Sequence, residues 1–281
     1  MQLPLRLIRV EAVQPLTPHL IRVTFSSPDP VTLDGPDQQV KLYFPRPGQT
    51  VPRLPARDST SFYQDYLAIP EAERPWMRSF TIRYADPLRI DFVLHSVGPA
   101  AGPACAWARA ARPGQVLGMF GPSAEYARPV PLLTSVAEAD WLLMVGDDTA
   151  LPAIGTLVEA LPAGGRAVAF LEVDDEDDEV PLSSAADLTV HWIHRRSYGS
   201  LARGVRGAVL PPGAVFAFLA GEAGTVRTVR RHLVDERGVP KRAIDFSGYW
   251  RARLSQDDNP TPEDLADAQE MLASFGLSSR G

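Results

Sequence analysis

Short apolar runs separated by turn-forming residues fill the first 122 residues of the chain. Runs that alternate polar and apolar positions, or that are rich in β-branched and aromatic residues, predict strands at 6–13, 20–26, 40–44, 78–84 and 90–95. Proline, glycine and aspartate separate these runs, and an alanine-rich segment at 104–111 predicts one short helix closed by Pro113-Gly114. This pattern favours an antiparallel barrel or sandwich over repeated β/α units.

The pattern changes at Trp141, where strands begin to alternate with helices. The apolar run 141–146 suits a strand buried on both faces. Further strands are expected at 166–173, 188–194 and 214–220, and helices at 150–161 and 225–237. Thr-Pro-Glu-Asp at 261–264 resembles a helix cap with proline at the first helical position. This order predicts a parallel, doubly wound sheet.

The two patterns predict a two-domain β plus α/β protein. An antiparallel β-barrel is expected over residues 1–125 and a parallel α/β domain over 138–281, with the boundary inside 123–140. A chain of 281 residues is long enough for two domains of ordinary size.

Composition narrows the class of protein. The hydrophobic fraction of 45% and the charged fraction of 22% are those of a globular protein, and no apolar run approaches the roughly 20 residues that span a bilayer. The first residues lack the pattern of a secretory signal, and the single cysteine, Cys105, excludes an intramolecular disulfide and a cysteine-based metal cluster. We therefore expect a cytoplasmic, monomeric protein without membrane contact. The net charge of −6 argues against nucleic-acid binding, and an anionic substrate would need a local basic pocket.

Arg78-Ser79-Phe80-Thr81 is the segment with the clearest chemistry. Because strand side chains alternate between faces, Arg78 and Phe80 should lie on one face and Thr81 on the other. A flavin needs these groups: a cation for its phosphates, a flat apolar wall for its rings, and a short hydrogen-bonding group at its reactive edge. The alternative interpretation of the same four residues is an ordinary alternating strand.

A barrel followed by an α/β domain is the plan of the ferredoxin–NADP reductase-like flavoenzymes, in which an Arg-x-aromatic-Ser/Thr strand holds the flavin. Here the resemblance is more specific. Pro-Glu-Ala-Glu-Arg-Pro-Trp-Met-Arg-Ser-Phe-Thr-Ile-Arg at 70–83 resembles the FAD segment of the siderophore-interacting protein family, the ferric-siderophore reductases. Further segments match that family's motifs in order, at 91–95, 102–108, 113–114, 146–153, 220–222 and 248–251.

The resemblance implies FAD as the cofactor and assigns roles to single residues. Arg78 would bind the phosphates, Phe80 would stack on the ring system, and Thr81 would lie near the reactive nitrogen. Ser79, between Arg78 and Phe80 in the sequence, is also expected to contact the cofactor. The family usually has tyrosine where this chain has Phe80, so we expect stacking without a phenolic hydrogen bond.

The resemblance adds FAD contacts before and within the expected short helix: His95, Gly102, Ala104, Cys105 and Trp107. Small residues at a helix start allow backbone N–H groups to approach a pyrophosphate. Residues 98–100 (Gly-Pro-Ala) compete with 102–104 (Gly-Pro-Ala) as this turn, and we favour the second. His95 could instead be a hydrogen-bonded residue at a strand end. For Cys105 a small packing role is favoured over a reactive thiolate.

In the second domain the resemblance implies nicotinamide contacts from Asp147, Thr149 and Trp250. A Gly-x-Gly-x-x-Gly fingerprint is absent, so the resemblance alone carries this assignment. The acidic loop 174–179 could bind ribose hydroxyls and repel a 2′-phosphate, which predicts NADH over NADPH. The alternatives are a solvated loop without a ligand, and ferredoxin as the electron donor.

The expected substrate is a ferric siderophore, an anionic chelate that needs cations around it. Lys41 matches a basic position that the family uses around the flavin, and Arg251 is the second candidate. Arg83 and Arg46 are weaker candidates, and Ser123 stands where the family frequently carries another base. We expect no catalytic acid or base and no protein-bound metal.

The expected reaction is flavin-dependent reduction of Fe(III) to Fe(II), which releases the iron. Two alternatives keep the fold: a siderophore- or flavin-binding carrier with little turnover, and a general NAD(P)H flavin or quinone oxidoreductase. The tail 257–281 could cap a domain or cover the active site.

Overall fold

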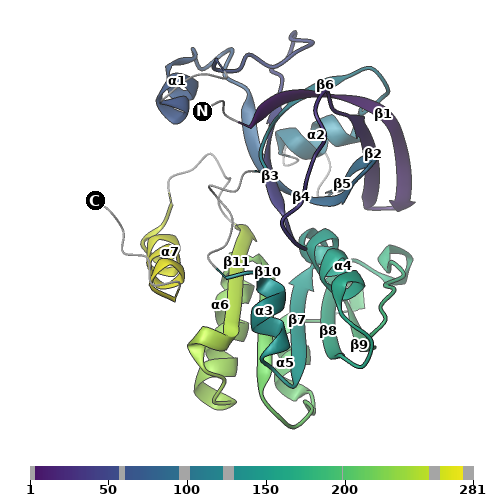
Figure 1. Cartoon of the computed structure of the whole chain (residues 1–281), viewed down its shortest axis with the longest axis vertical. Helices are drawn as coiled ribbons and strands as arrows, with labels where there is room; N and C mark the ends of the chain where they lie inside the picture. The colour runs from purple at the N-terminus through teal and green to yellow at the C-terminus, as the bar shows by residue number, and fades with distance from the viewer. Residues whose placement is uncertain are drawn as a thin grey trace. The chain divides into compact units, whose positions relative to one another are not determined.

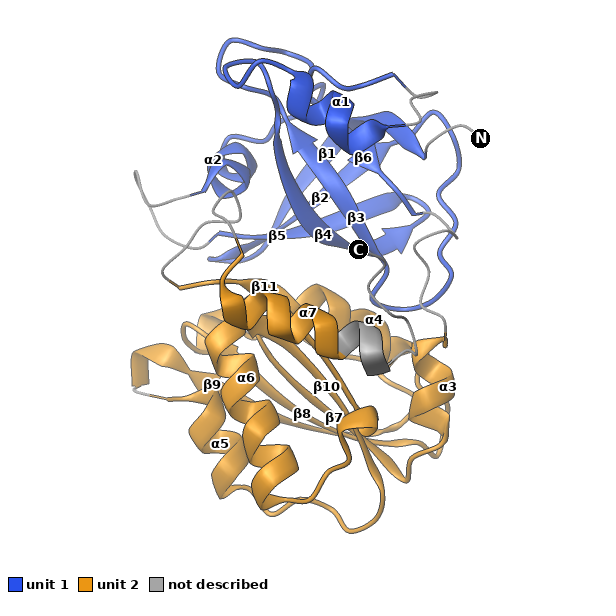
Figure 2. Cartoon of the chain, turned by 90° about the vertical axis from the view of Figure 1, so that its left-hand side faces the viewer, with its two compact units in different colours: residues 1–127 blue, residues 128–281 orange. Residues whose placement is uncertain are grey.

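The computed structural model describes residues 4–56, 61–94, 102–122, 130–197, 199–252 and 260–274. The chain forms two compact units, residues 1–127 and residues 128–281 (Figure 2). Each unit has its own sheet and its own hydrophobic core, so each is described by itself. The expected domain limits, 1–125 and 138–281, stay predictions about where independently folding domains begin and end.

The first unit is a closed antiparallel barrel, which confirms the expected class. Its six strands run in the order β1-β2-β5-β4-β3-β6 (Figure 1). They are β1 (Leu5–Thr17), β2 (Leu20–Ser26), β3 (Gln39–Phe44), β4 (Trp76–Ala85), β5 (Leu88–Val93) and β6 (Val116–Phe120). Alternate residues of each strand fill the interior, as Val23, Leu42 and Ile90 do with almost no exposed surface.

Strand β6 was not predicted, because its sequence Val-Leu-Gly-Met-Phe is apolar throughout and does not alternate. Gly118 breaks the strand pattern for a packing reason. A Cβ at this position would lie 2.7 Å from Leu54 Cδ1 and 3.1 Å from Tyr43 Cβ, so a larger residue would force the Leu54 side chain to shift.

Two short helices cover the barrel. Helix α1 (Phe62–Ala68), which was not predicted, buries Tyr66 against Tyr43 and Leu5 on the outer surface of the barrel. Helix α2 (Pro103–Arg109) matches the expected alanine-rich helix and adds Cys105 and Ala108 to the barrel core.

The second unit is a five-stranded parallel sheet in the order β11-β10-β7-β8-β9, which confirms the doubly wound prediction (Figure 1). Its strands are β7 (Trp141–Asp147), β8 (Arg166–Val173), β9 (Asp187–His194), β10 (Val215–Glu222) and β11 (Ile244–Trp250). Helices α3 (Leu132–Ala137) and α4 (Leu151–Ala160) pack on one face. Helices α5 (Leu201–Gly207) and α6 (Ala223–Arg231) pack on the other. The expected helix over 225–237 is thus divided, since a π-helical turn at His232–Glu236 follows α6.

The last described element is helix α7 (Pro262–Ser274), which lies beside α6 (Figures 1 and 2). Its cap confirms the expectation from the sequence. The Thr261 amide donates to Asp264 Oδ2 at 2.9 Å, and the Asp264 amide donates to Thr261 Oγ1 at 3.2 Å, so the pair forms a reciprocal capping box. Among the helices in the described part of the chain, none has both the length and the apolar character that crossing a membrane requires.

Candidate functional site

Strand β4 places the predicted flavin-binding residues through its pairing with β3. Phe80 lies opposite Val40 and Arg78 opposite Leu42, and both partners are buried inside the barrel. Arg78 and Phe80 therefore share the inner face of the sheet, as the alternation of strand side chains predicts. Ser79 lies opposite Lys41 on the outer face.

The Phe80 ring packs at one end of an aromatic cluster in the barrel. Its centroid lies 4.6 Å from that of Phe92 and 6.0 Å from that of Phe44. Trp107 of α2 extends the cluster, with centroids 5.4 Å from Phe92 and 5.5 Å from Phe44. Phe80 remains half-buried. Phe80 and Trp107 both pack against the barrel core, and both retain accessible surface.

The structure brings Lys41 and Ser79 together. Lys41 Nζ donates to Ser79 Oγ at 2.5 Å. Much of the Lys41 side chain is exposed, yet burial around its ammonium group lowers the pKa of Lys41. Arg78 is half-buried and donates from Nη1 to the Met77 carbonyl at 2.8 Å.

These groups fit a flavin nucleotide. Strands β3 and β4 present two cations, a hydroxyl and an accessible aromatic ring within four consecutive paired positions. On the inner face, Arg78 matches the anionic phosphates and Phe80 matches the flat ring system. Lys41 lies on the outer face and stays a predicted substrate cation. Thr81, also on β4, is buried at 7% exposure. Its hydroxyl is therefore largely shielded from solvent, and a contact through its backbone is favoured. The individual contacts with FAD remain predictions.

The start of helix α2 leaves room for a ligand. Gly102 caps the helix in an extended conformation, and a Cβ built on it would meet nothing within 4 Å. Ala104 packs against the barrel core, and Cys105 is buried in it at 7% exposure. This burial favours the packing interpretation of Cys105. His95, the competing turn at 98–100 and Ser123 lie outside the described residues.

In the second unit the carboxylate of Asp147 connects the predicted nicotinamide-binding residues. Asp147 Oδ1 accepts from the Thr149 amide at 2.9 Å and from Thr149 Oγ1 at 2.5 Å. Asp147 Oδ2 accepts from Trp250 Nε1 and from the Glu222 amide, both at 2.8 Å. Asp147 is 4% exposed. Thr149 and Trp250 are thus both hydrogen-bonded to Asp147, at the carboxyl ends of β7, β10 and β11.

Gly221 makes room for this carboxylate. Its φ is +134°, and a Cβ there would lie 2.6 Å from Asp147 Oδ2. Both the backbone conformation and the contact therefore exclude a side chain. In the sequence, the motif at 220–222 was recognised only through the family resemblance. The structure explains its glycine by the close contact with Asp147.

Next to this network, Arg195 gathers three carboxylates, an arrangement that was not predicted. Arg195 contacts Asp148 directly, Asp174 Oδ1 at 3.0 Å from Nε, and Glu172 Oε1 at 3.7 Å from Nη1. Burial and the neighbouring Asp147 carboxylate raise the pKa of Asp148 to about 7, although Arg195 acts in the opposite direction. The available signal in the sequence was Arg195-Arg196, placed directly after an expected strand.

The acidic loop 174–179 is largely paired within the second unit. Besides the Arg195–Asp174 pair, Arg196 Nη1 lies 2.6 Å from Asp175 Oδ2 and His194 Nε2 lies 2.8 Å from Glu179 Oε1. Glu176 and Asp177 are exposed, so the loop is partly solvated, and cations offset part of the negative charge on which the preference for NADH was based.

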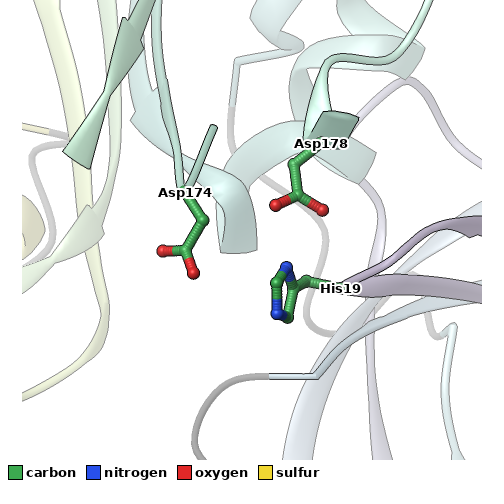
Figure 3. Close-up of side chains that lie close together, drawn as sticks. All are labelled: His19, Asp174 and Asp178. Atoms are coloured by element: carbon green, nitrogen blue, oxygen red, sulfur yellow. The ribbon is translucent and has the colours of Figure 1, made fainter. Parts of the chain in front are cut away.

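The loop also carries two carboxylates that are shown in Figure 3. Asp174 follows β8 directly, and Asp178 belongs to the turn Glu176–Asp178 and is buried at 4% exposure. His19, drawn with them, belongs to the first unit, so the three side chains do not form a site within either unit.

Arg251, the second predicted substrate cation, follows β11 directly. Its Nη1 lies 3.0 Å from Asp264 Oδ2 of helix α7. Lys41 and Arg251 belong to different units, and the structure shows Arg251 paired with a carboxylate of its own chain.

A flavin-type barrel followed by a doubly wound sheet defines the class: a flavin-binding oxidoreductase fold of the ferredoxin–NADP reductase type. Comparison with known proteins agrees. A ferredoxin NADP⁺ reductase from Neisseria gonorrhoeae, 14% identical, superposes with a TM-score of 0.60 over 88% of this chain and 99% of that one, which shows the fold alone.

The chain belongs to the siderophore-interacting protein family. The siderophore-interacting FAD-binding domain model matches residues 9–126, and the siderophore-interacting protein model matches residues 139–253. The ferric vibriobactin reductase ViuB of Vibrio cholerae is 31% identical over 250 residues, 85% of this chain and 86% of ViuB. A siderophore utilization protein from T. fusca is 31% identical, with a TM-score of 0.70 over 92% of this chain and 97% of that one.

Proposed function

We propose that this protein reduces the iron of an anionic ferric siderophore, with electrons passed from NADH through FAD bound on the first unit. The observation that carries the proposal is the pairing of β3 and β4, which places Arg78 and Phe80 on one face of the sheet and the contact between Lys41 and Ser79 on the other. It combines groups that suit a flavin with a cation that suits a negatively charged chelate. The similarity to ViuB, named a ferric reductase, supports the same reaction.

When bound, FAD supplies the redox chemistry, since it takes two electrons as hydride and gives them singly, so that one NADH reduces two ferric ions. The residues of the chain bind and orient. Arg78 holds the phosphates, Phe80 stacks on the rings, and Lys41 attracts the chelate and offsets the negative charge that grows as Fe(III) becomes Fe(II). Ferrous ions bind hard oxygen ligands less tightly than ferric ions, so reduction releases the iron.

NADH as the donor, in preference to NADPH or ferredoxin, is part of this proposal, as are a monomeric state and a cytoplasmic location. The Asp174 and Asp175 carboxylates support NADH, because a 2′-phosphate would add negative charge beside them. The preference should be modest, since Arg195 and Arg196 already pair with these two groups.

The test is anaerobic and uses the full chain reconstituted with FAD. We expect NADH to bleach the flavin absorbance and a ferric siderophore to restore it, with one Fe(II) trapped by a ferrous-specific dye per electron transferred. Reoxidation by a quinone but not by ferric chelates would replace the proposal with a general oxidoreductase. Tight chelate binding without reoxidation would replace it with a carrier.

A further inference from the structure

Helix α7 turns an acidic face toward the rest of the second unit. Within residues 262–270, the half-buried side chains are Asp264, Asp267 and Glu270. They are spaced three residues apart and therefore lie on one side of the helix. Leu265, by contrast, is 52% exposed. A helix that docks through the hydrophobic effect shows the opposite arrangement, with its apolar stripe inward.

Each of these carboxylates meets a cation. Arg227 of α6 lies 2.6 Å from Asp264 and 2.7 Å from Asp267. Glu270 lies 2.6 Å from Arg230 and 2.9 Å from Lys241, and Asp264 also meets Arg251. A cavity of about 330 Å³ lies along this contact and is lined mainly by Arg227, Arg230, Arg231, Lys241, Glu263 and Asp267.

Docking of this kind is weak and sensitive to salt. Each partly exposed ion pair contributes little to stability, and dissolved ions screen it. The paired groups here are partly exposed, Arg227 at 26% and Asp267 at 30%. Within residues 262–270 no side chain is buried, so release of this part of the helix uncovers little apolar surface.

Arg227 and Arg251, which pair with α7, lie near the edge of the sheet where proteins of this fold bind ligands. Arg251 follows the last residue of β11, and Arg227 lies in α6, which begins directly after β10. Open α/β sheets bind ligands at the carboxyl ends of their strands. Asp264, in the first turn of α7, pairs with both arginines at this edge.

We propose that α7 is an electrostatic latch: its carboxylates occupy an anion-binding site formed by Arg227 and Arg251, and a multiply charged anionic chelate displaces it. The identity of that anion, a siderophore complex, rests on the function proposed above. The latch would make binding depend on charge, because the ligand must compete with Asp264 for the same two guanidinium groups.

The test uses gallium(III) complexes, which match ferric complexes in charge and shape but are not reduced. The trianionic tris-catecholate complex is compared with the neutral tris-hydroxamate complex by calorimetry on the full chain. In Asp264→Asn the amide oxygen can still accept the capping bond from Thr261, while the charge is lost. We expect the Kd of the trianionic complex to fall about three- to tenfold and that of the neutral complex to stay unchanged.

Glu263→Gln is the matched control, since it removes one exposed carboxylate from the same turn. We expect it to change neither Kd by more than about twofold. An unchanged Kd in Asp264→Asn, or an equal change for both complexes, would overturn the latch.

Hydrogen exchange provides the second measurement. At a saturating concentration of the trianionic complex, amides of α7 should exchange faster while those of α6 keep their protection. Unchanged protection of α7 would reject displacement. Gallium is not reduced, so this test is independent of turnover. If the latch is observed but no ferric complex is reduced, only the proposed function is rejected. If ferric complexes are reduced but no latch is observed, only the latch is rejected.

Discussion

Trp250 Nε1 donates a 2.8 Å hydrogen bond to Asp147 Oδ2, across 103 positions of the sequence. The same carboxylate accepts from the Glu222 amide and from Thr149. It thereby ties the end of β7 to the ends of β10 and β11. We interpret Asp147 as the group that positions Trp250 at the edge of the sheet, and the nucleotide contact expected from the sequence stays a prediction.

Asp147→Asn should destabilise the second unit by about 2–4 kcal/mol, because one amide NH₂ would face hydrogen-bond donors in a buried site. Thermal unfolding followed by tryptophan fluorescence measures this effect. Asp187→Asn, at the exposed start of β9, is the matched control and should shift the midpoint little. Equal shifts in the two variants would show that the Asp147 network contributes nothing specific.

Gly221→Ala should be at least as costly, by about 2–4 kcal/mol, because alanine disfavours a φ of +134° and its Cβ would meet Asp147 Oδ2. Gly207→Ala is the control. Gly207 ends helix α5 and has open space around it, so alanine should be neutral or slightly stabilising there. The two midpoints of thermal unfolding compare them directly, and a Gly221→Ala variant as stable as the parent would contradict the steric account.

The fold could be predicted because its signals are local. Alternation along 20–26 and 78–84 and the apolar run 141–146 fix the type of each element without knowledge of its partners. Strands β6 and β11 and the short helices α1, α3 and α5 were missed. Neither β6 nor α1 has a clear period, because β6 is apolar throughout and α1 is short and rich in aromatic residues.

The candidate site could be predicted only in part, because side-chain partners come from distant segments. Residues such as Phe80, Asp147 and Trp250 were marked by family motifs. Nothing local in the sequence pairs Arg195 with Asp148, 47 positions away, or Arg227 with Asp264, 37 positions away. Such pairs follow from strand order and helix docking, which the chain reaches only on folding.

Asp148 should make stability depend on pH. Burial and Asp147 raise its pKa from 3.8 to about 7. The folded chain then holds this proton to a higher pH than the unfolded chain does. The contribution of Asp148 to stability is therefore greatest near pH 4 and below, and it declines as the pH rises toward 7.

Asp148→Asn, which is neutral at every pH, should remove this dependence. The difference in unfolding midpoint between variant and parent should shift in favour of the variant between pH 5 and pH 8. Asp187→Asn, measured in parallel, should show no such trend. A difference for Asp148→Asn that stays constant with pH would contradict the raised pKa.

Phe80→Leu separates stacking from packing on β4. Leucine keeps apolar volume beside Phe92 but loses the flat ring, so FAD affinity should fall about three- to tenfold with a modest loss of barrel stability. Fluorescence titration of the apoprotein with FAD gives the affinity. Phe62→Leu, in α1 on the outer side of the barrel, is the control for loss of an aromatic ring and should leave FAD affinity unchanged. If both variants bind FAD as the parent does, Phe80 does not stack on the flavin.

Lys41 tests the role of charge in the first unit. Lys41→Met removes the cation but keeps an unbranched side chain on the outer face of β3, opposite Ser79. If Lys41 attracts the anionic chelate, KM for a trianionic ferric complex should rise about three- to tenfold, and KM for a neutral complex should change little. The Lys41→Arg variant should restore most of the affinity, since it restores the charge. Added salt should weaken binding of the trianionic complex to the parent more than to Lys41→Met, because screening acts on the charge that the variant lacks. An equal rise in KM for both complexes would show instead that Lys41 acts through the local structure of β3 and β4.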